Sequence, residues 1–233
     1  MTGWERLKWD VRRIYFQLRK GLLHMRIGQQ WETDGRGFQH RRYPDYKTYV
    51  QHQKTKLSAL RSKSVIRHDQ EFYEALTERL RAYPGDWRGR SVLCLAARQG
   101  TEVRAFIDQG AFAVGIDLNP GPSSRYVVHG DFHALQFGDH SVDCVYTNSL
   151  DHAYELGQII AEVRRVLRPD GLFVVEANTD SQTGAAGQGP FETTIWEGLD
   201  SLLKQLEANG FTLKSRSSFD SPWRGSQLVL RPG

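Results

Sequence analysis

The residues from Ser91 to Asp117 constrain the fold more tightly than any other stretch of the chain. Val92 to Ala97 form a short, nearly continuous apolar run, which is typical of a strand covered on both faces. Gly100 ends the turn that follows, and apolar residues spaced three and four apart predict a short helix that Gly110 stops. That apolar stripe consists of Val103, Phe106 and Ile107.

A second buried strand is predicted from Ala111 to Ile116, and Asp117 stands at its carboxyl end. In an open α/β sheet, ligands bind at the carboxyl ends of the strands, where a carboxylate can accept hydrogen bonds from both hydroxyls of a ribose. The stretch therefore favours a nucleoside-binding unit. The alternative is a parallel sheet with a solvated aspartate at a strand end, because fold alone does not fix function.

The length of 233 residues suits one α/β domain with an appendage, and 39% hydrophobic residues suffice for a substantial core. No apolar run approaches the roughly 18–20 residues of a membrane span, and the charged start lacks the apolar core of a signal peptide. Cys94 and Cys144 fall inside predicted buried strands and match no metal-ligand spacing. These features predict a cytoplasmic protein.

Charge is distributed unevenly along the chain. Residues 1–67 hold 16 Lys and Arg against 5 Asp and Glu, a net charge of +11, whereas residues 68–233 hold 15 against 22, a net charge of −7. We therefore expect a basic helical N-terminal extension over 1–67 and a second domain over 68–233. Such an extension suits contact with phosphate, lipid headgroups or an acidic surface.

Within the extension, apolar residues recur at spacings of three and four and predict an amphipathic helix. They are Trp4, Leu7, Val11, Ile14, Leu18, Leu22 and Met25, with Arg12, Arg13, Arg19, Lys20 and Arg26 among the polar positions. Three interpretations stay open: packing on the rest of the protein or on a second subunit, peripheral contact with an anionic membrane, and nucleic-acid binding. Nucleic acid is the least favoured, because no recognisable binding motif accompanies the charge. We expect a loop over 28–44 and a helix over 45–63.

Helices and strands alternate through the rest of the chain. Helices are expected over 68–83, 153–167 and 197–208, and further strands over 126–129, 142–148, 172–176, 211–217 and 227–230. With the two strands above, this order predicts seven strands with helices between most of them, as in a mostly parallel sheet.

The order of elements and the local motifs over roughly 70–231 resemble class I S-adenosylmethionine-dependent methyltransferases. VLCLAARQG at 92–100 stands where that family has a loop such as VLDLGCGTG, and GIDLN at 115–119 matches the second-strand acid. GDF at 130–132 resembles the adenine-contacting turn, and EVRRVLRPDGLFVVE at 162–176 is the most recognisable stretch. The resemblance implies a Rossmann-like, doubly wound α/β fold with a seven-stranded, mostly parallel sheet and helices on both faces.

The same resemblance implies S-adenosylmethionine as cofactor and S-adenosylhomocysteine as product. Asp117 would bind the ribose hydroxyls, Leu118 and Phe132 would pack beside the adenine, and Asp131 would accept from its amino group. The full set of implied cofactor-binding residues is Ala96, Ala97, Arg98, Gly100, Glu102, Asp117, Leu118, Asn119, Asp131, Phe132 and Asn148.

The first loop departs from the family pattern. Only Gly100 of the loop glycines is kept, and Cys94 replaces the acid that helps to hold the cofactor's ammonium group. Glu102 is a candidate substitute carboxylate, and a surface capping role is the alternative. Arg98 has two interpretations as well, contact with the cofactor carboxylate or exposure to solvent.

Asp151 and His152 follow the fourth strand and are the candidate catalytic pair, because a histidine beside a carboxylate can take a hydroxyl proton. In the alternative, Asp151 caps the next helix and His152 is exposed. A divalent metal held by this pair has little support, and no metal site is predicted.

We expect O-methylation of a sugar hydroxyl on a glycan, nucleotide-sugar or lipid-linked saccharide, with the extension at the inner face of a membrane. Aromatic and polar residues suited to a sugar face support this expectation, among them Trp196 and Trp223. The alternatives are methylation of a small molecule or RNA, and a non-catalytic binding module with this fold. A nicotinamide-dependent oxidoreductase is disfavoured, because the three-glycine fingerprint is missing. A homo-oligomer is compatible with the sequence.

Overall fold

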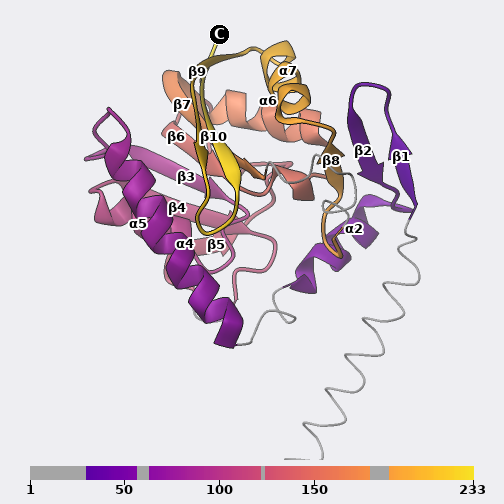
Figure 1. Cartoon of the computed structure of the whole chain (residues 1–233), viewed down its shortest axis with the longest axis horizontal. Coiled ribbons are helices and arrows are strands. Elements are labelled where there is room, and N and C mark those ends of the chain that lie inside the picture. The colour runs from indigo at the N-terminus through magenta and orange to yellow at the C-terminus, as the bar shows by residue number, and fades with distance from the viewer. Residues whose placement is uncertain (1–29, 57–62, 122–123, 179–188) are drawn as a thin grey trace, which may run out of the picture.

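A seven-stranded sheet forms the centre of the computed structural model, which describes residues 30–56, 63–121, 124–178 and 189–233 (Figure 1). The strand order is β5-β4-β3-β6-β7-β10-β9, with every neighbouring pair parallel except those that involve β10. The strands are β3 (Ser91–Leu95), β4 (Phe112–Asp117), β5 (Val127–His129), β6 (Val142–Thr147), β7 (Leu167–Asn178), β9 (Phe211–Phe219) and β10 (Gly225–Pro232). The predicted doubly wound, mostly parallel sheet is confirmed.

Helices cover both faces of this sheet (Figure 1). α4 (Lys63–Ala82) and α5 (Thr101–Asp108) lie on one face, and α6 (Leu156–Val166) and α7 (Leu199–Ala208) lie on the other. Alternate residues of β3 show the division: Cys94 belongs to the core under α4 and α5, whereas Leu93 belongs to the core under α6 and α7. Because both faces are buried, the strands carry the continuous apolar runs seen in the sequence.

A second, three-stranded antiparallel sheet joins the start of the described chain to its last third. β1 (Trp31–Thr33) pairs with β2 (Phe38–Arg41), and β2 pairs with β8 (Thr194–Trp196). The expected loop over 28–44 is therefore wrong. Asp34 tightens the hairpin by accepting from the backbone amides of Arg36 and Phe38 at 2.8 and 3.3 Å. β2 forms a strand because it pairs with β8, about 155 residues later in the chain, and the residues around β2 give no sign of that pairing.

The helix expected over 45–63 is shorter than predicted. α2 (Tyr46–Lys54) starts at the N-cap Asp45, whose carboxylate accepts from the Thr48 amide at 2.7 Å, and it ends at Thr55. α4 starts at Lys63, five residues before the predicted position. The predicted amphipathic helix of the extension, from Trp4 to Met25, lies outside the described residues, and the division at 67/68 stays a prediction.

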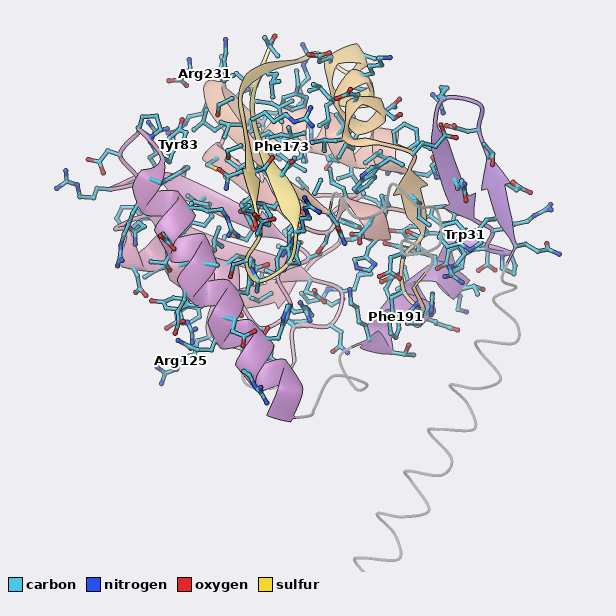
Figure 2. All side chains as sticks on the ribbon, viewed as in Figure 1. Trp31, Tyr83, Arg125, Phe173, Phe191 and Arg231 are labelled. Carbon is cyan, nitrogen blue, oxygen red and sulfur yellow. The ribbon has the colours of Figure 1, made fainter. Side chains whose placement is uncertain are left out.

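The described part of the extension contacts the central fold directly. Tyr49 donates from its hydroxyl to the His152 carbonyl at 3.0 Å, and Gln53 donates to the Phe191 carbonyl at 2.8 Å. Phe191 lies beside α2 in Figure 2. Among helices of the described chain, none combines the length and apolar character needed to cross a membrane.

Candidate active site

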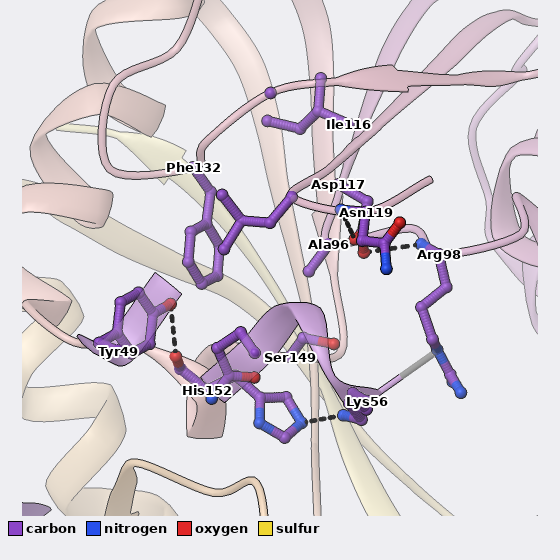
Figure 3. A pocket seen from close by; sticks show the side chains of 13 residues that line it. Tyr49, Lys56, Ala96, Arg98, Ile116, Asp117, Asn119, Phe132, Ser149 and His152 are labelled. Carbon is purple, nitrogen blue, oxygen red and sulfur yellow. Dashed lines mark hydrogen bonds between the residues drawn. The ribbon is translucent and has the colours of Figure 1, made fainter. Parts of the chain in front are cut away.

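A cavity that is partly open to solvent lies at the carboxyl ends of β3 and β4 (Figure 3). The loop from β3 to α5 forms one wall. Three of its residues have left-handed backbone conformations, with φ of 53° at Ala96, 42° at Arg98 and 81° at Gly100. Ala96 and Arg98 stand at positions of the loop where the resembled pattern has glycine. Non-glycine residues held at positive φ store strain, and such strain concentrates at ligand sites.

Asp117 fixes this loop from the end of β4. One carboxylate oxygen accepts from the Arg98 amide at 3.0 Å, and the other accepts from the Asn119 amide at 2.7 Å. A carboxylate offers about four lone-pair positions, so two remain for hydroxyl donors. Asp117 therefore keeps acceptor capacity at the edge of the cavity.

Several of the predicted cofactor-binding residues line this cavity together. They are Ala96, Arg98, Asp117, Leu118, Asn119 and Phe132, with Ile116 and Gly130 beside them. Ile116, Leu118 and Phe132 supply apolar surface suited to a flat ring. Asn119 also donates from its side chain to the Lys54 carbonyl at 3.0 Å, which ties the β4 end to α2.

Asp131 is not among the residues that line the cavity. One of its oxygens accepts from the backbone amide and the ring of His133, both at 2.9 Å, and the other accepts from the Tyr46 hydroxyl. Burial works to raise the pKa of Asp131, but the hydrogen bonds from His133 and Tyr46 outweigh burial and hold the pKa below its usual value. The carboxylate thus anchors α2 to the turn after β5.

Four other predicted residues do not line this cavity either, and one of them, Asn148, lines the second cavity described below. Ala97 and Glu102 are buried on the α5 side of the loop, where burial raises the pKa of Glu102 to about 8. The alternative of a surface position for Glu102 is wrong, because this side chain is inside the protein. Gly100 precedes α5 and allows the tight turn, in which its amide donates to the Ala97 carbonyl at 2.6 Å.

A second cavity, also open to solvent, adjoins the first. Four residues line both cavities, and they are Lys56, Arg98, Ser149 and His152. The other lining residues come from the ends of β6 and β7 and the residues just after β6, from the segment that includes β8, and from the loop between β9 and β10. They include Asn148, Asp151, Glu176, Asn178, Glu192, Thr194, Trp196 and Trp223.

His152, in the short 3-10 helix η1 (Leu150–His152), is held at both ring nitrogens. Nδ1 donates to the Phe191 carbonyl at 2.9 Å, and Nε2 accepts from the Lys56 ammonium. Burial, together with the charge of Lys56, lowers the pKa of His152 to about 3, so the ring is neutral. The alternative of an exposed His152 beside a capping Asp151 is wrong. His152 is 8% exposed, and the helix that follows, α6, starts at the N-cap Glu155 instead of at Asp151.

Lys56, Tyr49 and Gln53 are site residues that the sequence analysis did not identify. All three come from the extension and line the first cavity. Their pattern indicated a helix near this position, but no local signal indicated where that helix docks. Burial is the largest effect on Lys56 and lowers its pKa to about 8, with the neighbouring Arg98 acting in the same direction.

The cluster of Asp151, His152 and Glu192 does not fit a divalent metal, although its ligand atoms lie within 4.8 Å of one another. Both His152 nitrogens have partners, and a lysine ammonium already faces the ring. A metal ligand must offer a free lone pair. We therefore assign this cluster no metal.

Comparisons with known proteins agree with this fold. Residues 93–175 match a family model described as a methyltransferase domain. An uncharacterized methyltransferase from Synechocystis sp. is 30% identical over 165 residues, which cover 62% of this chain and 76% of that protein. An uncharacterized methyltransferase from Mycobacterium avium is 32% identical over 124 residues, which cover 45% of this chain and 49% of that protein.

Solved structures show the same fold at low identity. The Burkholderia thailandensis 1,6-didemethyltoxoflavin-N1-methyltransferase, with its substrate and S-adenosylhomocysteine bound, aligns with a TM-score of 0.65 at 16% identity and covers 87% of this chain and 99% of that one. A putative Haloferax volcanii methyltransferase in complex with the Trm112 activator aligns with a TM-score of 0.61 at 19% identity and covers 78% and 96%.

Proposed function

The chain belongs to the class I S-adenosylmethionine-dependent methyltransferases, and on that basis we propose that it methylates a hydroxyl of a sugar or a similar polyol. The cofactor, when bound, supplies a methyl group already activated on a sulfonium. What remains for the protein is to position the acceptor in line with that methyl and to receive the hydroxyl proton.

The residues of the first cavity support the cofactor half of this proposal. Asp117 retains lone pairs for a ribose diol, and Phe132 and Leu118 supply apolar surface for an adenine. Small side chains at the loop, above all Ala96, leave room for the remainder of the cofactor. Asp131 is engaged by Tyr46 and His133, so adenine recognition rests on the apolar walls and on Asn119.

The observation that carries the acceptor half is a pair of buried polar atoms without hydrogen-bond partners. Trp196 Nε1 donates to no acceptor and Asp151 Oδ1 accepts from no donor within the described part of the chain, and both residues line the second cavity. Buried polar groups without partners are costly, and a site that contains them selects ligands that supply the partners. Hydroxyl groups both donate and accept, so a polyol offers the acceptor that Trp196 Nε1 lacks as well as the donor that Asp151 Oδ1 lacks.

Trp223 adds an apolar surface to the same cavity. Its ring packs at 5.0 Å from Phe72 and 5.9 Å from Phe219, which holds it in place at the rim. An aromatic face beside polar side chains suits the mixed surface of a sugar ring. The predicted amphipathic helix of the extension, for which membrane contact is one of three interpretations and would suit a lipid-linked saccharide, lies outside the described residues.

Transfer of a labelled methyl group tests this proposal. The purified protein is incubated with labelled S-adenosylmethionine and, separately, with methyl glycosides and nucleotide-sugars, with simple phenols and with RNA. We expect label on the glycosides or nucleotide-sugars. Trp196→Phe should lower kcat/KM for that acceptor by about 10-fold and leave S-adenosylhomocysteine affinity unchanged, because one buried hydrogen bond contributes about 1–3 kcal/mol.

Two further variants control this experiment. Asp117→Ala should weaken S-adenosylhomocysteine binding by about 10-fold or more, since it removes an ionised acceptor of two hydrogen bonds. Asp170→Ala changes an exposed carboxylate of β7 and should behave like the original protein. Label on RNA or a phenol, with none on any glycoside or nucleotide-sugar, would contradict the proposal. Failure to bind either form of the cofactor would favour a non-catalytic module instead.

A further inference from the structure

Lys56 lies where the two cavities meet, and no part of the sequence pattern assigned it a role. It lines the first cavity together with Asp117 (Figure 3), and it lines the second cavity together with Trp196. Methyl transfer requires the acceptor oxygen and the methyl carbon to meet at such a junction. We propose that Lys56 is the catalytic base that receives the proton of the acceptor hydroxyl, an inference that rests on the proposed function.

His152 orients the amine of Lys56. Its Nδ1 is held by the Phe191 carbonyl at 2.9 Å, which leaves Nε2 as an acceptor directed at Lys56. A neutral lysine has two N–H bonds and one lone pair. With one N–H donated to Nε2, the lone pair is free to face the acceptor hydroxyl. His152 is therefore a positioning residue, and its own accepting nitrogen is already occupied.

The charged and titratable groups around Lys56 come from every element beside it. Arg98 belongs to the loop after β3, Asp117 to the end of β4, Asp151 and His152 to η1, and Glu192 to the segment before β8. Burial and Arg98 disfavour the ammonium, whereas the three carboxylates favour it. The balance holds the pKa of Lys56 at about 8, close to the range in which a general base works well near neutral pH.

The proposed step balances without a metal. The O–H bond of the acceptor breaks and its proton moves to Nζ of Lys56, while the oxygen electron pair forms the new O–C bond. The C–S bond breaks and its electron pair returns to sulfur, which leaves a neutral thioether. The ammonium of Lys56 then loses its proton to solvent.

This arrangement predicts that cofactor binding and Lys56 protonation are linked. S-adenosylmethionine carries a positive sulfonium, whereas S-adenosylhomocysteine is neutral at sulfur. A second positive charge in a cavity lined by Lys56 lowers the pKa of the lysine further. Binding of the sulfonium form should therefore release a proton, and binding of the thioether form should release less.

Calorimetric titration measures this release without any acceptor. The full chain is titrated with each cofactor form near pH 8, in two buffers of different ionisation enthalpy, and proton release follows from the difference in heat. If the pKa of Lys56 falls by about one unit, about 0.4 more proton is released with S-adenosylmethionine than with S-adenosylhomocysteine. Lys56→Met should abolish this difference while still binding S-adenosylhomocysteine.

Matched variants separate Lys56 from its neighbours. Lys47→Met changes an exposed lysine of α2 and should keep the difference, and so should His152→Gln, because the amide still accepts from Lys56. Lys56→Met should also lower kcat for hydroxyl methylation by about 100-fold or more. Equal proton release with both cofactor forms, or a difference that persists in Lys56→Met, would overturn the role of Lys56 and leave the proposed function standing. Absence of binding by either form would overturn the proposed function and this inference with it.

Discussion

At the scale of single residues, Glu176 is the most completely paired charge near the site. Its carboxylate, at the end of β7, accepts from Arg79 at 2.7 and 2.9 Å, from the Tyr146 hydroxyl at 2.9 Å and from Gln227 at 2.9 Å. The side chain of Glu176 is fully buried, and that of Arg79 is 14% exposed. The network connects α4, β6, β7 and β10 beneath the second cavity.

Loss of Arg79 should therefore be strongly destabilising. We expect Arg79→Met to lower the free energy of unfolding by about 3–5 kcal/mol, because the variant leaves a buried carboxylate without its counter-charge. Urea denaturation of both proteins measures the change. Arg88→Met removes one partner of an exposed pair with Asp86 and serves as the control, with an unchanged midpoint. Equal midpoints for all three proteins would show that the buried pair contributes nothing.

The same scale shows what the sequence could predict about the site. Asp117, Leu118 and Phe132 were predicted correctly as neighbours, because the ends of parallel strands converge at one edge of a sheet. Asp131 and Glu102 were expected in the cofactor site because of their positions in the family motifs. A motif position does not show which other side chains of the protein hydrogen-bond to a carboxylate. Tyr46 takes one oxygen of Asp131, and it comes from 85 residues earlier in the chain.

At the scale of elements, β8 was not predicted, whereas the strands of the central sheet and helices α4 to α7 followed from periodicity, since their apolar faces are set by the sheet that they form or cover. β1 and β2 did not, because three or four residues of mixed polarity form a strand only when a partner such as β8 is present. A helix was predicted from residue 45, over a longer range than α2 occupies, and its cap at Asp45 was seen only in the structure. Its docking over the cavity depends on Tyr46 and Tyr49, whose partners are distant in sequence.

The cap of α2 should contribute measurably to stability. Asp45→Ala removes the acceptor for the Thr48 amide and should lower Tm by about 2–4 °C. Asp45→Asn keeps a good N-cap and should stay near the original Tm. Thermal unfolding followed by circular dichroism compares the three proteins. A loss of equal size in both variants would mean that the charge of Asp45, rather than the cap hydrogen bond, is what stabilises the helix.

At the scale of the whole molecule, the first cavity is built from both parts of the chain that the sequence analysis distinguished, the basic extension and the domain after residue 67, whose net charge is negative. The central sheet supplies Ala96, Arg98 and Asp117, and the described part of the extension supplies Tyr49, Gln53 and Lys56 across from them. A ligand in this cavity touches both parts. Its binding free energy should therefore stabilise α2 against local opening as well as the loop after β3.

Hydrogen exchange tests this coupling directly. Saturating S-adenosylhomocysteine should slow amide exchange in the loop from Ala96 to Gly100, in α2 and in η1, because each of them contributes residues to the cavity. Amides of α7 should serve as the internal control, since that helix packs on the sheet through Leu199, Leu202 and Leu206 and does not line the cavity. Protection confined to the loop, with exchange in α2 unchanged, would contradict a shared site, and the extension would then pack beside the cofactor cavity without contributing to its affinity.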